Sequence, residues 1–276
     1  MNIQKIAILG SGSMGTAILS GLLKAGIDAK SVSVSTKSTA SATRLATELG
    51  VNAFSAEMHA DANSRAAAGA DVVLVAVKPM YVTQVLGEVA DALVRDALVI
   101  SVAAGITAAA MEAALPASVA VIRSMPNTPA IVGRAVTGLA RGSRATNAQL
   151  TKAVSLFETV GKVVVLDESK IDQLTSISGS GPAYVFYLIE EFTKAAEAFG
   201  FDTETANLLV AETFLGASEL LVASGKAPSE LRKQVTSPNG TTERAIAQLE
   251  LGNLANLFKS ATEAAVARAK EIAAGN

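Results

Sequence analysis

The sequence contains no cysteine and only one histidine, and these absences remove several kinds of chemistry. Without cysteine there is no disulfide, no thiolate nucleophile and no cysteine-based metal site. His59 alone cannot form a metal cluster, and no other histidine is present to act as the base of a serine triad. We therefore predict no metal site, and we place His59 in a solvated connecting segment.

Aromatic residues make up only 4% of the chain while 50% of the residues are apolar, so the core must consist mainly of alanine, valine, leucine and isoleucine. The 23 basic and 25 acidic residues give a net charge of −2 and are spread along the sequence. Because there is no basic stripe or charged tail, nucleic acid and anionic membranes are not expected as partners. With no run of 18 apolar residues and no leader-like segment, a soluble cytoplasmic protein is expected.

Two regions differ in their pattern of predicted elements, and 276 residues is about the length of two domains. Up to residue 166, short β-branched runs alternate with alanine-rich helical stretches, and nearly continuous apolar runs are typical of strands buried on both faces. We predict an α/β fold in which 1–166 forms a doubly wound Rossmann domain with a mostly parallel sheet. The predicted strands are 6–10, 31–35, 72–77, 98–103, 119–124, 135–140 and 163–166.

After residue 166 only helices are predicted, so 167–276 is expected to form an all-helical second domain. The segment 203–224 is apolar nearly all round, with Leu208, Leu215 and Val222 at intervals of seven. Such a helix must be buried nearly all round. It is either buried in the middle of its own domain or shared with a second copy in a symmetric dimer, which we favour because the domain is short. The predicted helices are 168–177, 182–199, 203–224, 228–235, 241–250 and 253–274.

A glycine-rich G-x-G-x-x-G sequence follows the first predicted strand and opens a helical stretch. It consists of Gly10, Ser11, Gly12, Ser13, Met14 and Gly15. Gly10 permits the tight turn, Gly12 lets the backbone approach a pyrophosphate, and Gly15 lets helix and strand pack closely. The position between a strand and a helix, at the start of the alternating series, favours dinucleotide binding over a purely structural turn.

The end of the second predicted strand indicates which dinucleotide is bound. NAD enzymes usually carry an acidic residue about 20 residues after the glycine motif, where it binds the ribose 2′-hydroxyl. Here the chain carries Ser35, Thr36, Lys37 and Ser38 instead. Hydroxyl donors and a cation suit a 2′-phosphate, so we predict NADPH as the preferred cofactor and NADH as the alternative. The competing interpretation of Lys37 is an ordinary solvated lysine.

Two later segments close strands at the same edge of the sheet, where their backbones can line the cofactor crevice. Lys78 is either a cofactor contact or a rim residue. A third glycine cluster, 179–182, has proline at a helix entrance, which favours close helix packing over ligand contact. The two segments are Ala76, Val77, Lys78 and Pro79, and Ala103, Ala104 and Gly105.

The segment 235–246 combines hydroxyl groups with the free amides of a predicted helix start, and such a terminus favours anions. A carbonyl acceptor would need a lysine, histidine or tyrosine as its acid. The β-hydroxyacid dehydrogenases have a similar layout and a lysine near this point, but 178–191 contains none. A protonated imine needs little acid catalysis, so we predict a small cyclic imino acid as the substrate. A reductase of another imine or a small keto acid, and a non-enzymatic dinucleotide sensor, are the alternatives.

Motifs along nearly the whole chain resemble the pyrroline-5-carboxylate reductase family. The resemblance implies reduction of 1-pyrroline-5-carboxylate to L-proline by NAD(P)H, the last step of proline biosynthesis. It also implies a Rossmann domain followed by a helical dimerisation domain, a homodimer, and often a ring of dimers, such as a decamer of five. The motifs are GSGSMG at 10–15, AVKP at 76–79, SVAAGI at 101–106, RSMPNTPA at 123–130, ISGSGPAYVF at 177–186 and APSELRKQVTSPNGTTERAIAQLE at 227–250.

The same resemblance implies roles for the segment 237–242. Thr242 would be the catalytic residue, beside the ring nitrogen of the substrate. Ser237, Gly240 and Thr241 would hold the substrate carboxylate, together with Thr242. Asn239 departs from the family, which normally has glycine there, but asparagine tolerates left-handed backbone better than other non-glycine residues.

Three further residues are implied by the resemblance alone. Glu168 would approach the substrate, Gln234 would approach the substrate and the nicotinamide, and Asn63 would approach the adenosine ribose. Because helices of the partner subunit complete the site in this family, a monomer is expected to be inactive.

Overall fold

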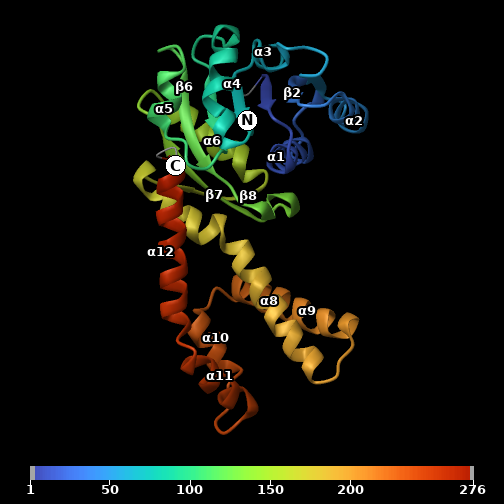
Figure 1. Ribbon diagram of the computed structural model, residues 1–276, viewed down its shortest axis with the longest axis vertical. Helices are drawn as coiled ribbons and strands as arrows, with labels where there is room; N and C mark the ends of the chain where they lie inside the picture. Colours follow the sequence, from blue (N-terminus) through green and yellow to red (C-terminus); the bar gives the residue numbers. More distant parts are fainter. Residues whose placement is uncertain (1–3, 274–276) are drawn as a thin grey trace. The chain divides into compact units, whose positions relative to one another are not determined.

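The computed structural model describes residues 4–273 and divides the chain into two compact units. The first unit contains the described residues up to Ser180 and those from Ala265 on, and the second is Gly181–Ala264. Figure 1 shows that the first unit holds the strands with helices around them, whereas the second is helical. The functional division expected after residue 166, where the strands end, remains a prediction.

An eight-stranded sheet forms the centre of the first unit, in the order β3-β2-β1-β4-β5-β6-β7-β8. Neighbouring strands are parallel except β6 and β7, which are antiparallel. The mostly parallel, doubly wound sheet expected from the sequence is thus confirmed. The strands are β1 Ile6–Leu9, β2 Val32–Thr36, β3 Asn52–Ser55, β4 Val72–Val75, β5 Leu98–Ser101, β6 Ala120–Met125, β7 Ala135–Arg141 and β8 Gly161–Val165.

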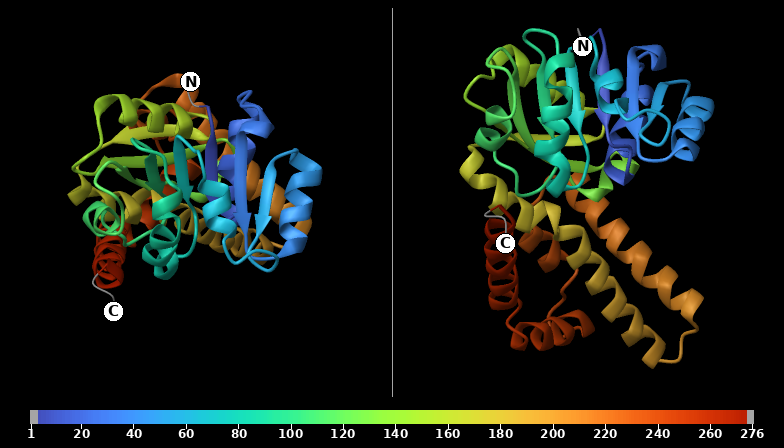
Figure 2. Two further views of the ribbon diagram at one scale, coloured as in Figure 1. Left: turned by 90° about the horizontal axis from the view of Figure 1, so that it is seen from above. Right: turned by 45° about the horizontal axis from the view of Figure 1, so that its top comes forward.

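Helices cover both faces of this sheet, as Figure 2 shows. In β1, Ile6 and Ile8 pack in the core with α1 and α6, while Ala7 and Leu9 pack in the core with α3, α4 and α5. Burial on both faces explains why the strand sequences are almost wholly apolar. The helices of this unit are α1 Ser13–Lys24, α2 Thr39–Leu49, α3 Ala62–Ala67, α4 Val82–Val89, α5 Ala108–Ala113, α6 Asn147–Glu158 and α7 Ile171–Leu174.

The predicted helix at 168–177 is a series of short pieces. A 3-10 turn at Glu168–Lys170 leads into α7, which is followed by a π-helical turn at Thr175–Gly179. The Thr175 and Ser178 hydroxyls donate to backbone carbonyls four residues earlier, in competition with regular helix bonds. Asn127 also donates to the carbonyl of Ser178, at 2.9 Å, which ties this turn to the segment after β6.

The second unit consists of helices that leave much apolar surface uncovered. Asp202 is the N-cap of α9, and hydrogen bonds from the Thr205 amide and hydroxyl lower the pKa of its carboxyl group. Within the unit, α8 packs along α9. The helices are α8 Gly181–Ala198, α9 Thr203–Ser224, α10 Pro228–Gln234, α11 Thr241–Leu251 and α12 Leu254–Ala273, whose last turns belong to the first unit.

α9 is not buried in the middle of its own domain. Only Ala206 and Val210 are buried, whereas Leu208 is 62% and Val222 74% exposed. In the described part of the chain, α9 alone is long and apolar enough to cross a membrane, a test that helices buried in soluble proteins also pass. The interpretation that remains from the sequence is burial against a second copy.

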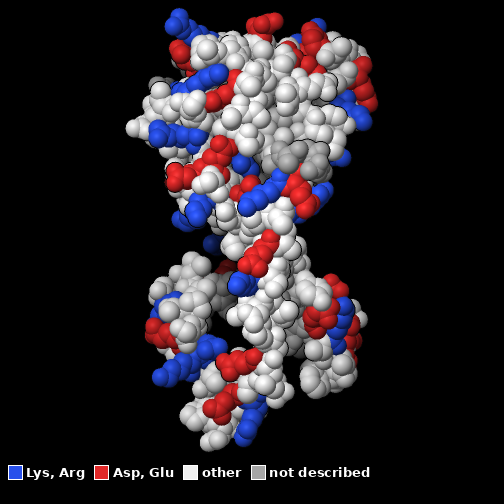
Figure 3. Space-filling view, turned by 60° about the vertical axis from the view of Figure 1, so that its left-hand side comes forward, with Lys and Arg blue, Asp and Glu red and all other residues white. Residues whose placement is uncertain are grey.

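Charged side chains of both signs are intermixed on the face shown in Figure 3. Within the second unit, Lys194 pairs with Glu190 and Glu191 about one turn earlier on α8, whereas Arg232 on α10 pairs with Glu250 on α11. The hydrogen bonds that Lys194 Nζ donates to the carboxylates of Glu190 and Glu191 raise the pKa of Lys194 above its ordinary value. Because these ion pairs of Lys194 are exposed to solvent, their contribution to stability is small.

Candidate active site

The glycine motif forms the turn between β1 and α1, and each glycine meets a different demand. Gly10 has φ of +89°, and a Cβ there would lie 2.8 Å from Val77 Cγ1. A Cβ on Gly15 would overlap the carbonyl oxygen of Gly10. By contrast, a Cβ on Gly12 would meet nothing within 4 Å. The conformation and packing of the turn therefore require glycine at positions 10 and 15. At position 12, glycine instead leaves open space beside the helix terminus.

That helix terminus is suited to an anion. Gly12 is the N-cap of α1 and supplies no side-chain hydrogen bond, and the first turn has no acidic residue. Among the described residues, none accepts from the amides of Ser13 and Met14. A pyrophosphate fits this terminus, because free amides and the helix dipole both favour negative charge and a Cβ at Gly12 would fill the space it needs.

The glycine turn is fastened to β2 through Ser35. The Gly10 amide donates to both the carbonyl oxygen and Oγ of Ser35, at 3.2 Å each. Ser35 Oγ in turn donates to Oδ1 of Asn63, at 2.7 Å, and Nδ2 of Asn63 donates to Glu88 at 2.8 Å. Ser35 and Asn63 therefore both lie beside the glycine turn, but the Ser35 hydroxyl is buried and already engaged within the protein.

The residues expected to read a 2′-phosphate differ in their availability. The Thr36 hydroxyl is buried and donates to the carbonyl of Ser38, at 2.8 Å. Lys37 is exposed and has no ion-pair partner among the described residues. A carboxylate that the sequence pattern did not single out also lies here, because Glu57 Oε2 accepts from the Thr39 amide at 2.8 Å, in the first turn of α2.

The two other cofactor segments lie along the same edge of the sheet. The Ala76 amide donates to the carbonyl of Leu9, at 2.8 Å, and the Val102 amide donates to that of Val75, at 3.0 Å. The segment 76–79 thus leaves β4 beside the glycine turn, and Ala103 and Ala104 follow β5 next to it. Lys78 is exposed, as both interpretations of it require.

The segment 237–242 forms a second anion-favouring terminus, in the second unit. Gly240 is the N-cap of α11 without a side-chain cap, and no described residue accepts from the amides of Thr241 and Thr242. A Cβ on Gly240 would lie 2.5 Å from Ser237 Oγ, so the turn is tight. Asn239 has φ of 60°, the left-handed conformation expected of it.

Two side chains near this terminus limit what it can bind. Glu243 Oε2 accepts from the Asn239 amide at 2.9 Å, so one negative charge already stands at the start of α11. Gln234 lies exposed on α10, with Nε2 3.5 Å from Glu230 Oε1. The structure thus places Gln234 with the residues at 237–242 in one unit, and the glycine turn with Asn63 and Glu168 in the other.

Glu168 is held by a buried arginine that the sequence pattern did not single out. Glu168 Oε1 accepts from the Ala108 amide at 2.7 Å and lies 3.5 Å from Arg123 Nη1. Arg123 Nη2 donates to Asp172 Oδ1 at 2.8 Å, and the arginine side chain is only 5% exposed. The sequence feature that could have indicated this ion pair is the single arginine within the apolar run of β6, because a charge in a buried strand needs buried partners.

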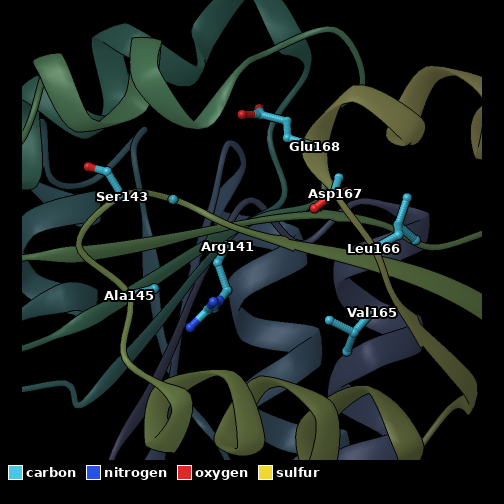
Figure 4. A pocket seen from close by; sticks show the side chains of 8 residues that line it. Arg141, Ser143, Ala145, Val165, Leu166, Asp167 and Glu168 are labelled. Atoms are coloured by element: carbon cyan, nitrogen blue, oxygen red, sulfur yellow. The ribbon is translucent and has the colours of Figure 1, made fainter.

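A polar recess of about 650 Å³ lies at the ends of β7 and β8. Figure 4 shows Glu168 and Ser143 on one side of the strands and Arg141 and Val165 on the other. Several of its polar groups are already paired, as Ser143 donates to Glu112 and Arg141 to Asn147. Glu168 is the only lining residue with an expected role, so the recess by itself indicates no ligand.

Two family models match the chain. One, described as pyrroline-5-carboxylate reductase dimerisation, matches residues 168–272. The other, described as NADP oxidoreductase coenzyme F420-dependent, matches residues 5–105. The first match contains α9 and the α11 terminus, and the second contains the glycine turn, Lys37 and Asn63.

Relatives resemble the chain over its full length. The pyrroline-5-carboxylate reductase of Pseudomonas aeruginosa is 38% identical over 274 residues, covering 99% of this chain and 98% of the relative. That of Corynebacterium melassecola is 37% identical over 270 residues, covering 97% and 98%.

Solved structures agree with these relatives. A pyrroline-5-carboxylate reductase from Coxiella burnetii has a TM-score of 0.91 at 38% identity, covering 98% of each chain. The pyrroline carboxylate reductase of Plasmodium falciparum, solved with NADP bound, has a TM-score of 0.84 at 26% identity, covering 99% of this chain and 98% of that one. With this likeness in sequence and fold from end to end, the chain belongs to the pyrroline-5-carboxylate reductase family.

Proposed function

We propose that the chain reduces 1-pyrroline-5-carboxylate to L-proline with NADPH as the preferred hydride donor, as the last step of proline biosynthesis. NADH is the alternative donor. The observation that carries this proposal is the uncapped amino terminus of α11, where free amides and hydroxyls can hold a substrate carboxylate. Family membership and the open glycine turn at Gly12 also support the proposed function.

The cofactor half of the site is proposed to lie along the carboxyl edge of the sheet. The amides at the start of α1 would hold the pyrophosphate, Lys37 the 2′-phosphate and Asn63 the adenosine ribose. Bound NADPH supplies the hydride, so the chain has to provide position and electrostatics. The remaining contacts are proposed for Gly10, Ser11, Ser13, Met14, Gly15, Ser35, Thr36, Ala76, Val77, Lys78, Pro79, Ala103, Ala104 and Gln234.

In the substrate half, Ser237, Gly240 and Thr241 are proposed to hold the carboxylate. Thr242 would hydrogen-bond the ring nitrogen: when the carbon of the protonated C=N accepts the hydride, the π electron pair moves to nitrogen, which becomes an amine. Glu168 is proposed to border the substrate through Oε2, because only its Oε1 is engaged within the described chain. Most of the rate gain would come from alignment of the reacting atoms.

Replacing Thr242 by alanine is expected to lower kcat/KM for the imine by about 10- to 100-fold, because a hydrogen bond to a charged group contributes roughly 1.5 to 3 kcal/mol. Thr242→Ser, which keeps the hydroxyl, is the control and is expected to retain most of the activity. Steady-state kinetics with the purified variants measures both. Unchanged kinetics in Thr242→Ala would remove Thr242 from the mechanism.

Replacing Glu57 by glutamine is expected to lower KM for NADPH by about 3- to 10-fold and to leave KM for NADH unchanged. The Glu57 carboxylate occupies the Thr39 amide at the start of α2, near Lys37, where it would repel a 2′-phosphate. The control is Glu48→Gln, at the other end of the same helix, which forms an exposed ion pair with Arg44. An equal change in both KM values would separate Glu57 from phosphate recognition.

We propose that the active form is a homodimer, in a larger ring of five dimers, in the cytoplasm. The exposed face of α9 supports a second copy as the partner, as does an apolar recess of about 520 Å³ lined by Tyr187, Leu188, Leu257 and Phe258. Helices of the partner would complete each site, which makes the isolated monomer inactive.

The deciding experiment follows the loss of NADPH absorbance when the purified protein is mixed with 1-pyrroline-5-carboxylate. NADH and a panel of small keto acids and other cyclic imines are run in parallel. Rapid oxidation only with 1-pyrroline-5-carboxylate is the expected result. Measurable NADPH binding without oxidation would overturn the proposed function, and turnover confined to another acceptor would redirect it to that substrate.

A further inference from the structure

Two consecutive residues of β6 anchor the two ends of the 102–107 segment that joins β5 to α5. At the start of the segment, Ser124 Oγ donates to the carbonyl of Ser101, at 2.8 Å. At its end, Glu168 Oε1 accepts from the amide of Ala108, the first residue of α5. Arg123 holds this glutamate from the opposite face of the strand, since neighbouring residues of a strand point to opposite sides.

The Arg123 side chain is built into the protein interior between two carboxylates. It donates to Asp172 at 2.8 Å and lies 3.5 Å from Glu168, whose side chains are 20% and 31% exposed. Its Nε has no hydrogen-bond partner in the described chain. A planar guanidinium can reach both acids at once, whereas the single ammonium of lysine cannot match that fork.

The segment held in this way lies on the nicotinamide side of the sheet. The glycine turn follows β1, and β2 and Asn63, the proposed adenosine contacts, lie to one side of it. Since dinucleotides cross the point where the strand order reverses, the nicotinamide half of bound NADPH would be held by residues that follow β4 and β5. Ala103 and Ala104 leave β5 there, between the anchors at Ser101 and Ala108.

We propose that Arg123 is a positioning residue for hydride transfer: through Glu168 it fixes the 102–107 segment against which the nicotinamide rests. The proposal deepens the proposed function and rests on it for the nature of the cofactor. Its physical basis is that a short segment anchored at both ends moves when either anchor moves. A displacement of about 1 Å at the reacting atoms can cost on the order of 100-fold in rate.

The test compares Arg123→Lys with Arg144→Lys in the full-length protein. Arg144 Nη1 donates to the carbonyls of Leu115 and Pro116, just beyond the other end of α5, so it fastens the same helix without touching the 102–107 segment. Titration calorimetry measures the Kd of NADPH and of 2′-phospho-ADP-ribose, which lacks the nicotinamide. Kinetics with saturating imine and NADPH gives kcat, and urea unfolding reports stability.

In Arg123→Lys, the Kd of NADPH is expected to rise by about 3- to 10-fold, the effect of one lost hydrogen bond. The Kd of 2′-phospho-ADP-ribose stays unchanged, and kcat falls by about 10-fold or more. In Arg144→Lys all three values stay at those of the wild type. Equal weakening of both ligands in Arg123→Lys, or the same losses in Arg144→Lys, would show a general structural role and overturn the proposal.

Two provisions keep the outcome decisive. If Arg123→Lys does not fold, Glu168→Gln is used, because it keeps an acceptor for the Ala108 amide but loses the charge paired with Arg123; the same selective loss of NADPH affinity is expected. If the wild type binds NADPH but does not reduce the imine, the proposed function fails, while the comparison of the two ligands still decides the role of Arg123.

Discussion

Replacing Gly12 by valine is expected to raise the Kd of NADPH by about 100-fold or more while the protein stays folded. A Cβ at this position would meet nothing within 4 Å, and the backbone is extended, with φ of −72° and ψ of −168°, which valine adopts freely. The added methyl groups would instead fill the space in front of the α1 amides. Losing two charge-assisted hydrogen bonds of roughly 1.5 to 3 kcal/mol each accounts for the expected loss.

The measurement is fluorescence titration with NADPH, together with urea unfolding of the same sample. Because valine is a poorer N-cap than glycine, the substitution is expected to lower the free energy of unfolding by at most about 1 kcal/mol. Gly15→Ala is the matched comparison, since its Cβ overlaps the backbone oxygen of Gly10 and cannot be relieved by a side-chain rotation. That variant is expected to lose stability as well as affinity. Normal NADPH affinity in Gly12→Val would place the pyrophosphate elsewhere.

Placing glutamates at Leu208 and Leu215 is expected to produce monomers and to lower activity by about 100-fold or more. In the single chain these leucines are 62% and 52% exposed, so the double substitution costs an isolated subunit little. In a dimer each buried leucine contributes about 1.5 to 3 kcal/mol, and an unpaired buried carboxylate adds a larger penalty. Symmetry doubles these losses, and the partner then no longer completes either site.

Sedimentation analysis measures the mass, and the imine assay measures the activity of the same fractions. Glu219→Gln, on the same helix, is the control and is expected to keep the wild-type mass and activity. A double variant that keeps the oligomeric mass would show that α9 is not the dimer surface. A monomer with full activity would show that one chain holds a complete site.

The strands could be predicted where burial leaves a continuous apolar run. Seven strands fall within two residues of their expected bounds. β3 could not be predicted, because it forms the sheet edge with Asn52 exposed and only Ser55 fully buried. The helical segment after Leu166 was expected as one helix, yet hydroxyl bonds and the contact from Asn127 divide it. Local sequence patterns therefore predict burial well, but they do not predict where side chains compete for the hydrogen bonds of the backbone.

The candidate site also contains both residues that the sequence predicted and residues that it did not. The glycine turn could be predicted because its requirements are local: a tight turn, a close approach and an open helix terminus within a few residues. Glu57 at the start of α2 and Arg123 beside Glu168 could not, since each pairs with residues 18 or 45 positions away. For Ser35, the sequence predicted a phosphate contact, but its hydroxyl already donates a hydrogen bond to Asn63.

The sequence by itself determined the class of this protein: the alternation of strands and helices, the dinucleotide turn, the anion-favouring start of α11 and the family. These follow from periodicity, glycine conformation and helix capping, which act between residues close in the chain. Only the tertiary structure decided which polar groups remain free, because a hydroxyl or carboxylate is available only if no distant segment folds onto it. It also decided that α9 stays exposed in one chain, since burial depends on every element packed around a helix.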